Sequence, residues 1–162
     1  MEIAVLLHNI RSLHNVGSIF RTADAAGAKK IYLCGITPAP VDRFEKIIPQ
    51  FAKVSLGAEK YLGWKKFPST LPLIKKLKDR GYKIFAIEQS KKSTPYFREA
   101  RRAKGTAKIV LVLGNEVRGL PPAVLKSADK ILEIPMLGGK ESLNVAVAFG
   151  IVAFGFLSRI SK

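Results

Sequence analysis

The stretch IAVLLHNIRSLHNVGSIFRTADAAG, residues 3–27, decides the fold that we expect for this chain. It opens with five apolar residues, which predict a strand buried on both faces. A helix over about 15–26 follows, and Gly27 ends it as the residue type that most readily adopts a left-handed backbone. Two histidines, two asparagines and two arginines crowd this segment, so we expect it to have a function as well as a structural role.

The same alternation of strand and helix continues along the 162 residues. Further apolar runs predict strands at 31–34, 83–87, 109–113 and 130–134. Helices are expected at about 70–80 before Gly81, in a short piece after Pro121 and Pro122, and from Ser142 onward. This order predicts an α/β domain, a parallel sheet with helices on both faces. Segment 36–69, with its prolines, glycines and Lys pairs, is expected to be a mostly irregular, partly helical excursion.

The charge balance indicates a polyanionic partner, with nucleic acid favoured over a membrane surface. Lys and Arg number 28 against 12 Asp and Glu, a net charge of +16, and twelve of these excess charges lie in 31–108. They concentrate in GWKKF (63–67), IKKLKDRGYK (74–83) and QSKKSTPYFREARRAKG (89–105). A solubilising charge with no partner remains the alternative.

Aromatic residues interleave with these charges, as expected where bases stack while Lys and Arg hold phosphates. They are Trp64, Phe67, Tyr82, Tyr96 and Phe97. Each is equally suited to anchor the core, and for Phe67 and Tyr82 we favour the core. The aromatic pattern therefore supports a nucleic-acid partner without proving one.

The sequence shows no sign of a disulfide, a metal site or a secretory signal. Cys34 is alone in the chain, which favours a small buried residue in a reducing compartment and a cytoplasmic protein. His8 and His14 lack the spacing of metal ligands, so we expect no metal. The start of the chain leads directly into an apolar strand without a basic leader.

The uncharged stretch 142–158 is too short and too interrupted for a membrane span, which needs about 20 apolar residues. It contains Asn144, Gly150 and Gly155. A helix that is apolar on all sides must still be covered on all sides. We interpret it as a C-terminal helix partly buried in a homodimer interface, where the glycines permit close approach.

Three polar clusters follow predicted strands, where parallel sheets bind their ligands. HNIRSLHNVGSIFR follows 3–7, GNEVRGL follows 109–113, and PMLGGKESLN follows 130–134. None contains the glycine pattern of a dinucleotide site or a P-loop. Two are rich in Gly and Asn, whose exposed backbone groups suit a small polar ligand such as an adenosine. We expect the three clusters to converge on one pocket.

These clusters carry a resemblance to a known family. The patterns Asn9-x-Arg11 and Asn15-x-Gly17-x-x-x-Arg21-x-Ala23, then LGNEVRGL, then IPMLGGKESLNVAVA, resemble the three motifs of the SpoU family. Its members are RNA 2′-O-ribose methyltransferases of the SPOUT class. The resemblance extends from residue 5 to about 155. Three ordered motifs at the expected separations are much more specific than any one alone.

The resemblance implies a fold that periodicity does not show. The chain would be a single methyltransferase domain over 1–162, with a deep trefoil knot in its cofactor-binding part at about 109–160. No separate RNA-binding domain is expected. Family members hold S-adenosylmethionine in the knotted loops and act as homodimers whose sites are completed across the interface. General experience with protein topology argues against knots, so this expectation rests on the resemblance alone.

The resemblance also assigns roles to residues. Arg21 is the catalytic residue at the ribose 2′-hydroxyl; because a guanidinium keeps its proton in proteins, we expect it to bind phosphate and stabilise alkoxide charge. The alternative for Arg21 is a surface ion pair with Asp24. Asn15 positions Arg21 or the ribose, or caps the helix. The remaining catalytic candidates are Glu116, Ser142 and Asn144, with two open alternatives: Glu116 pairs with an arginine, and Ser142 is a helix cap.

The cofactor-binding residues implied by the family lie mainly in the second and third motifs. They are Leu113, Gly114, Asn115, Ile134, Pro135, Met136, Ser142, Leu143 and Asn144, with Glu88 and Gln89 from another strand end. The N–H groups of the last helix would meet a carboxylate or phosphate. Asn9, Arg11 and Arg118 are the candidate RNA contacts.

The expected function is S-adenosylmethionine-dependent methylation of a ribose 2′-hydroxyl in RNA. We favour tRNA over rRNA, because a minimal domain must bind RNA with its own basic face. One alternative is a non-catalytic RNA-binding protein on a degenerate methyltransferase scaffold. Another is a nucleotide-using α/β enzyme with a small substrate, which leaves the basic middle of the chain unexplained.

Overall fold

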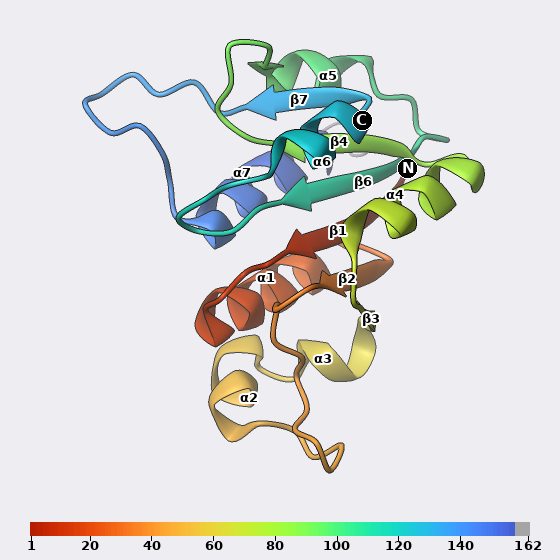
Figure 1. The fold of residues 1–162 in the computed structure, drawn as a ribbon, viewed down its shortest axis with the longest axis vertical. Helices are drawn as coiled ribbons and strands as arrows, with labels where there is room; N and C mark the ends of the chain where they lie inside the picture. The colour runs from red at the N-terminus through yellow and green to blue at the C-terminus, as the bar shows by residue number, and fades with distance from the viewer. Residues whose placement is uncertain (158–162) are drawn as a thin grey trace.

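The computed structural model describes residues 1–157, and its chain alternates strands and helices (Figure 1). The elements are β1 (Glu2–His8), α1 (Leu13–Ala25), β2 (Lys30–Cys34), α2 (Pro49–Ser55), α3 (Ala58–Tyr61), β3 (Gly63–Phe67), α4 (Thr70–Asp79), β4 (Lys83–Ile87), β5 (Thr94–Pro95), α5 (Tyr96–Arg102), β6 (Lys108–Leu113), α6 (Pro122–Ser127), β7 (Lys130–Glu133) and α7 (Val145–Leu157). The five strands predicted from the sequence are all present. Within the described residues the expected α/β class is confirmed.

The strands form one sheet in the order β3-β2-β1-β6-β4-β7-β5, and every neighbouring pair is parallel. β2 and β3 extend the sheet on one side of β1, whereas β6 adjoins β1 on the other side. Two late strands are inserted between earlier ones: β6 between β1 and β4, and β7 between β4 and β5. The carboxyl ends of the strands point to the left in Figure 1. This edge therefore receives all the polar clusters that follow strands.

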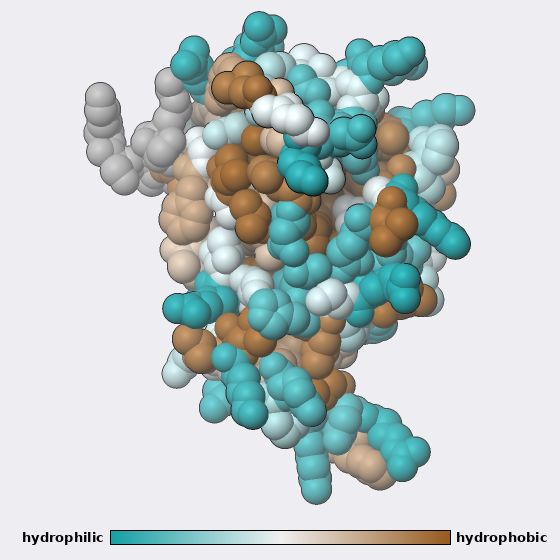
Figure 2. All heavy atoms as spheres, turned by 90° about the vertical axis from the view of Figure 1, so that its left-hand side faces the viewer, coloured by the Kyte–Doolittle hydropathy of each residue, from teal (hydrophilic) through white to brown (hydrophobic). Residues whose placement is uncertain are grey.

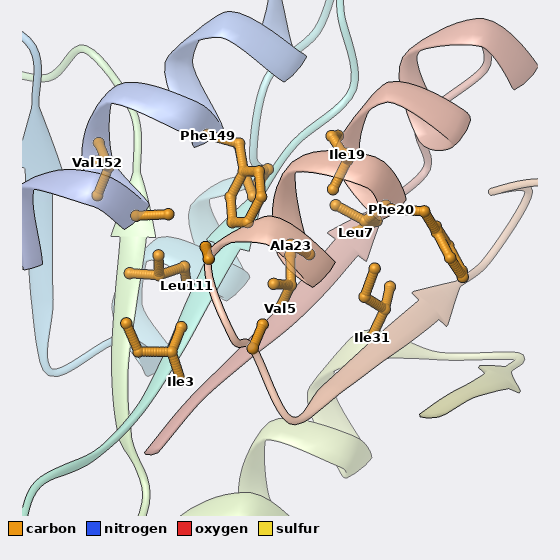
Figure 3. Packing of buried hydrophobic residues seen from close by; sticks show 14 of the residues in the cluster. Ile3, Val5, Leu7, Ile19, Phe20, Ala23, Ile31, Leu111, Phe149 and Val152 are labelled. Atoms are coloured by element: carbon orange, nitrogen blue, oxygen red, sulfur yellow. The ribbon is translucent and has the colours of Figure 1, made fainter. Parts of the chain in front are cut away.

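Helices cover both faces of the sheet, as predicted. On one face α1 and α7 lie side by side, and Figure 3 shows Ile19 of α1 and Phe149 of α7 packing above the strands. Val5 and Leu111 supply the strand side of this core. On the other face α4 and α6 pack together, and their buried residues are Leu73, Ile74, Leu77 and Val124. The strands between these two cores are buried on both sides, as their continuous apolar runs predict.

The excursion between β2 and α4 is more regular than predicted. It contains α2, α3 and the edge strand β3, which is GWKKF. Lys65 and Lys66 are exposed in β3, while Trp64 and Phe67 are half-buried. An edge strand has a partner on one side only and tolerates charged residues, so it lacks the apolar run by which interior strands are found. β5 and α5 were also missed, because a two-residue strand and a polybasic helix give no apolar pattern.

The last helix is covered mainly by its own chain. Phe149, Val152, Ala153 and Phe156 are fully buried. A Cβ at Gly155 would collide with the Tyr96 ring of α5, whereas one at Gly150 would make an ordinary contact with Thr22 of α1 at 3.6 Å. Gly155 therefore permits close approach within the chain, whereas we expected the glycines to permit it between subunits. The expected helix start at Ser142 is wrong, because α7 begins at Val145; its end at Ser158 lies outside the described residues.

The predictions that Cys34, Phe67 and Tyr82 are core residues agree with the structure. Cys34 is buried, and burial raises the pKa of its thiol to about 11. Phe67 and Tyr82 pack against the α4 side of the core. Within residues 1–157 no His, Cys, Asp and Glu side chains are grouped as metal ligands. No helix in the same part of the chain is long and apolar enough to cross a membrane.

Candidate functional site

A cavity of about 340 Å³ opens at the carboxyl ends of β4, β6 and β7. Figure 2 looks onto this side of the molecule, where apolar atoms gather in the upper half and hydrophilic residues surround them. The cavity is lined by Asn15, Ile87, Glu88, Gln89, Leu113, Gly114, Asn115, Glu116, Val117, Gly119, Leu132, Glu133, Ile134, Met136, Ser142, Leu143, Asn144, Val145 and Ala148. All three polar clusters contribute to it, so the predicted convergence is confirmed. Its size lies within the range of small-molecule sites.

The loop after β6 is folded back so tightly that position 114 has no room for a side chain. Asn115 and Gly119 form an antiparallel bridge, and the Asn115 side chain accepts hydrogen bonds from the backbone of Val117 and Arg118. A Cβ at Gly114 would lie 2.5 Å from the backbone carbon of Gly119. Gly119 itself has φ +64°, where an L side chain is strained. Glycine at 114 therefore lets this loop form one wall of the cavity.

Glu88 and Gln89 join the β4 end to the two neighbouring loops. The Glu88 carboxylate accepts the backbone N–H of Leu120 at 2.9 Å, and the Gln89 amide donates to the Ile134 carbonyl at 2.8 Å. These contacts fix the walls on either side of β4. Both residues line the cavity. Of the predicted cofactor residues, only Pro135 does not line the cavity.

Glu116 connects the second cluster to the start of α1. Its carboxylate accepts the backbone N–H groups of Arg11 and Ser12 at 2.9 and 3.0 Å and the side-chain amide of Asn15 at 3.1 Å. The expected alternative of an ion pair with an arginine is wrong for the described residues, since backbone amides take the place of a guanidinium. The geometry resembles the way helix N-termini bind carboxylates.

Asn15 continues this connection to the third cluster. Its Oδ1 accepts a hydrogen bond from the Asn144 amide at 3.0 Å, while its Nδ2 donates to Glu116. Asn15 is not the helix cap that we considered, because Ser12 occupies that position and accepts the Asn15 N–H. Asn144 in turn accepts the backbone N–H of Ala146 at 2.9 Å and so caps α7, the role that we considered for Ser142.

The charge of Glu116 is stabilised in the folded protein. Burial raises the pKa of its carboxyl, but hydrogen bonds from the backbone of Arg11 and Ser12 and from Asn15 outweigh this effect and hold the pKa below its usual value of 4.5. A carboxyl whose pKa is lowered by folding stabilises the folded state at pH values above its pKa in the unfolded chain. This stabilisation is lost as the pH falls through its pKa in the folded protein.

We therefore expect Glu116→Gln to lower the free energy of unfolding by about 1 kcal/mol at pH 7, because an amide donor replaces a charged acceptor. The difference from the unaltered protein should shrink as the pH falls below 4.5, where the carboxyl of the unfolded chain takes up its proton, and should be lost below the lowered pKa of the folded state. Urea unfolding across this pH range measures it. A difference that stays constant down to pH 3 would contradict the assignment.

Arg21 lies outside the main cavity. It lines a second hollow between α1, α2 and α7, together with His14, Ser18, Thr22, Ala25, Lys53, Val54 and Phe154. Neither Asp24 nor Glu116 forms an ion pair with it in the described part of the chain. Within one copy of the chain, the structure therefore does not bring Arg21 together with the other catalytic candidates.

The three candidate RNA contacts also lie outside the cavity. Arg11 and Arg118 are exposed beside its rim, next to the backbone that Glu116 and Asn115 hold. Asn9 has φ +54°, and its side chain accepts the Ile36 N–H while its carbonyl accepts the Asn115 amide. Asn9 therefore shapes the loop, which is the structural part of the role that we expected for it.

Sequence reasoning missed several cavity residues. The lining residues that were not predicted are Ile87, Val117, Gly119, Leu132, Glu133, Val145 and Ala148. Val117 and Gly119 stand within the second motif and could have been predicted from it, whereas the others face the cavity because of strand register and the start of α7. Three lining residues are acidic, Glu88, Glu116 and Glu133, in a chain with net charge +16. Apolar walls with carboxylates suit a ligand that combines an apolar ring with positive charge.

Comparisons with known proteins agree with this geometry. A family model described as the SpoU rRNA Methylase family matches residues 2–154. A tRNA (guanosine(18)-2′-O)-methyltransferase of Aquifex aeolicus is 34% identical over 153 residues, covering 94% of this chain and 67% of that protein. The enzyme of the same description from Thermus thermophilus is 31% identical over 153 residues, covering 94% of this chain and 73% of that protein.

Solved structures are similar over almost the whole chain. The AdoMet-bound rRNA methyltransferase of Sinorhizobium meliloti superposes with a TM-score of 0.85 at 30% identity. The similarity covers 99% of this chain but 57% of that one, so this chain spans little more than half the length of that neighbour.

Proposed function

Because the chain belongs to the SpoU rRNA methylase family, we propose that it is an S-adenosylmethionine-dependent methyltransferase that methylates a ribose 2′-hydroxyl in RNA. One observation carries this proposal. The three motifs meet in a single cavity, where hydrogen bonds join Glu116, Asn15 and Asn144.

The residues of the cavity fit S-adenosylmethionine. Leu113, Ile134 and Val145 provide apolar surface for the adenine, and the carboxylates in the cavity suit the positive charge of the sulfonium and amino groups. When bound, this cofactor supplies an electrophilic methyl group. The loop at Gly114 and the capped start of α7 shape the cavity. Glu116, Asn15 and Asn144 hold α1 and α7 at its mouth.

We propose that Arg21 acts at the ribose 2′-hydroxyl. It would bind the neighbouring phosphate and stabilise the negative charge that develops on the hydroxyl oxygen. Since Arg21 lies outside the cavity of its own chain, we propose a homodimer in which Arg21 of one copy completes the site of the other. Phe154, on the exposed side of α7, lines the same hollow as Arg21 and is 48% exposed. Val147 is 51% exposed on the same helix. These apolar residues suit such an interface.

We also propose that the part at about 109–160 is threaded as a deep trefoil knot, although its residues 158–160 lie outside the described residues. The insertion of β6 and β7 between earlier strands is compatible with this path, and the proposal rests on the family resemblance. The domain proposal, one methyltransferase unit over this sequence, is supported by the family match to 2–154.

We favour tRNA as the substrate. The two curated relatives with the names given above act on guanosine 18 of tRNA, and the chain covers about two thirds or more of each. An rRNA target is the second candidate, because the S. meliloti neighbour is described as an rRNA methyltransferase.

The decisive experiment incubates the protein with total RNA and methyl-labelled S-adenosylmethionine, followed by nucleoside mapping. We expect label in one 2′-O-methylnucleoside of the tRNA fraction. Label in rRNA would change the target and keep the reaction. Cofactor binding without label in either RNA would overturn the methyltransferase assignment, and calorimetry that finds no binding at millimolar cofactor would favour the non-catalytic scaffold.

A further inference from the structure

The three basic stretches of the sequence lie on different parts of the fold. GWKKF is the edge strand β3, and IKKLKDRGYK forms most of α4 on one face of the sheet. The third stretch, 89–105, lies at the opposite edge from β3 and contains β5 and α5 (Figure 1). Because the three stretches lie on different sides of the sheet, they differ in how close they come to the cavity.

Only the third stretch is continuous with the cavity. Its first residue, Gln89, lines the cavity and donates a hydrogen bond to Ile134 of the opposite wall. Four residues later Ser93 donates to the cavity residue Glu133 at 2.6 Å. The cavity contains no residue of β3, α4 or α6 among those that line it in the described chain. The third stretch therefore starts at the rim of the active cavity and leads away from it.

Its charges are turned toward solvent. We call its six cations the basic ridge: Lys91, Lys92, Arg98, Arg101, Arg102 and Lys104, all of which are exposed. The opposite side of α5 is attached to the protein, since Ala100 is buried and Tyr96 packs against the core. Glu99 is the single acid between Lys91 and Lys104, and its side chain is only 11% exposed. Glu99 binds Arg102, so the other five cations have no ion-pair partner in the described residues.

An aromatic ring accompanies these charges. Phe97 is 38% exposed, and the Arg101 guanidinium lies 5.7 Å from its ring centroid. Of the five aromatic residues that interleave with the basic stretches, Phe97 is the one classed among the exposed large hydrophobic residues in residues 1–157. A ring with a cation beside it suits an unpaired base whose phosphate binds the same cation.

We infer that the basic ridge is the surface that binds the RNA backbone beside the reacting nucleotide, with Phe97 as a stacking contact. This inference takes RNA as the ligand from the proposed function, on which it rests. It adds which surface of the protein binds that RNA. The ridge holds an extended row of cations that leads from the cavity, which matches a polyanion that enters the cavity at one nucleotide and continues along the surface.

The test compares two variants that lose the same number of charges. The ridge variant combines Lys91→Gln, Lys92→Gln, Arg98→Gln and Arg101→Gln. The control combines Lys75→Gln, Lys76→Gln, Arg80→Gln and Lys126→Gln, which are residues of the α4 and α6 face. Lys78 is left in place because it pairs with Asp129 at 3.2 Å. Binding of unmodified total tRNA is measured by fluorescence anisotropy over a series of salt concentrations, without methyl donor.

We expect the ridge variant to raise Kd on the order of 30-fold at 0.1 M salt and to reduce the slope of log K against log salt by about 3, since each lost phosphate contact removes about 0.7–0.9. The control should change Kd by less than about 3-fold and the slope by less than about 1. Equal losses in both variants would show that net charge alone binds RNA and would overturn the inference. A larger loss of RNA affinity in the control than in the ridge variant would place the RNA-binding surface on the α4 and α6 face and would also overturn the inference.

Two further measurements separate this inference from the proposed function. Cofactor affinity should be the same in the ridge variant and the unaltered protein, because the substituted residues do not line the cavity. If the unaltered protein binds tRNA through the ridge but never methylates RNA, the proposed reaction is overturned and the proposed RNA-binding surface is supported. If it methylates RNA and the ridge variant does so with unchanged KM, the ridge is wrong and the reaction stands. Loss of binding to anionic lipid vesicles without loss of RNA binding would also overturn the inference.

Discussion

Replacing Arg21 by alanine is expected to lower kcat for RNA methylation by about 10²–10³-fold, the usual effect of removing one group that stabilises developing oxyanion charge. Affinity for S-adenosylmethionine should not change, because the contacts that we propose for Arg21 are with the RNA and it does not line the cofactor cavity of its own chain. Single-turnover methylation of tRNA and calorimetry with the cofactor measure the two effects. Arg21→Lys keeps the positive charge but not the planar donor pair, so we expect it to retain only part of the activity.

Mixing variants tests whether two copies share one site. Arg21→Ala protein supplies an intact cavity, and a cavity variant supplies an intact Arg21. If each site uses both copies, random exchange of subunits between the two inactive dimers should restore about a quarter of the normal activity. No recovery after verified exchange would contradict the shared site. Unimpaired methylation by Arg21→Ala would reject the role of Arg21 itself.

Gly114→Ala is expected to abolish measurable cofactor binding and to lower the free energy of unfolding by about 1–3 kcal/mol, the usual cost of inserting a methyl group into a closed space. The added Cβ would lie 2.5 Å from the Gly119 backbone carbon and 2.6 Å from the Leu120 nitrogen. Both neighbours are backbone atoms, so the loop itself must move. That movement would open the wall of the cavity and break the Leu120 contact with Glu88.

Gly105→Ala is the matched control, because a Cβ at Gly105 meets no atom within 4 Å. We expect this control to keep both its unfolding free energy and its cofactor affinity. Urea unfolding and calorimetry on the two variants decide the question. Normal cofactor affinity in Gly114→Ala would contradict the role of this loop as a wall of the cavity.

The sequence predicted best where one element carries its own signal. β1, β2, β4, β6 and β7 are continuous apolar runs, and Gly27 and Gly81 follow their helices with positive φ as expected. The edge strand β3 and the helix α5 were missed for the same reason. Each contains charged, exposed residues in place of an apolar run, and its conformation depends on a neighbouring strand or helix that the local sequence does not contain.

Residue types in the site were predicted, but several of their partners were not. An ion pair with an arginine was one alternative for Glu116, which instead binds the backbone of Arg11 and Ser12, 105 and 104 positions earlier in the chain. Asn15 was considered as a cap, yet it connects Glu116 to Asn144 across 101 and 129 positions. Such pairings depend on how the strands are ordered in the sheet, which no local pattern encodes.

The amino-acid sequence by itself determined the α/β class, the three polar clusters, their family resemblance and the basic character of the surface. These properties depend on residue type and on spacing along the chain, which a sequence states directly. Only the tertiary structure decided that Asn144 caps the last helix, that Arg21 lies outside the cavity of its own chain, and that one basic stretch of three leads from the cavity rim. The physical reason is that strand order and helix packing set the distances between residues far apart in the chain. Hydrogen bonds and steric contacts form only between atoms that the fold brings close together.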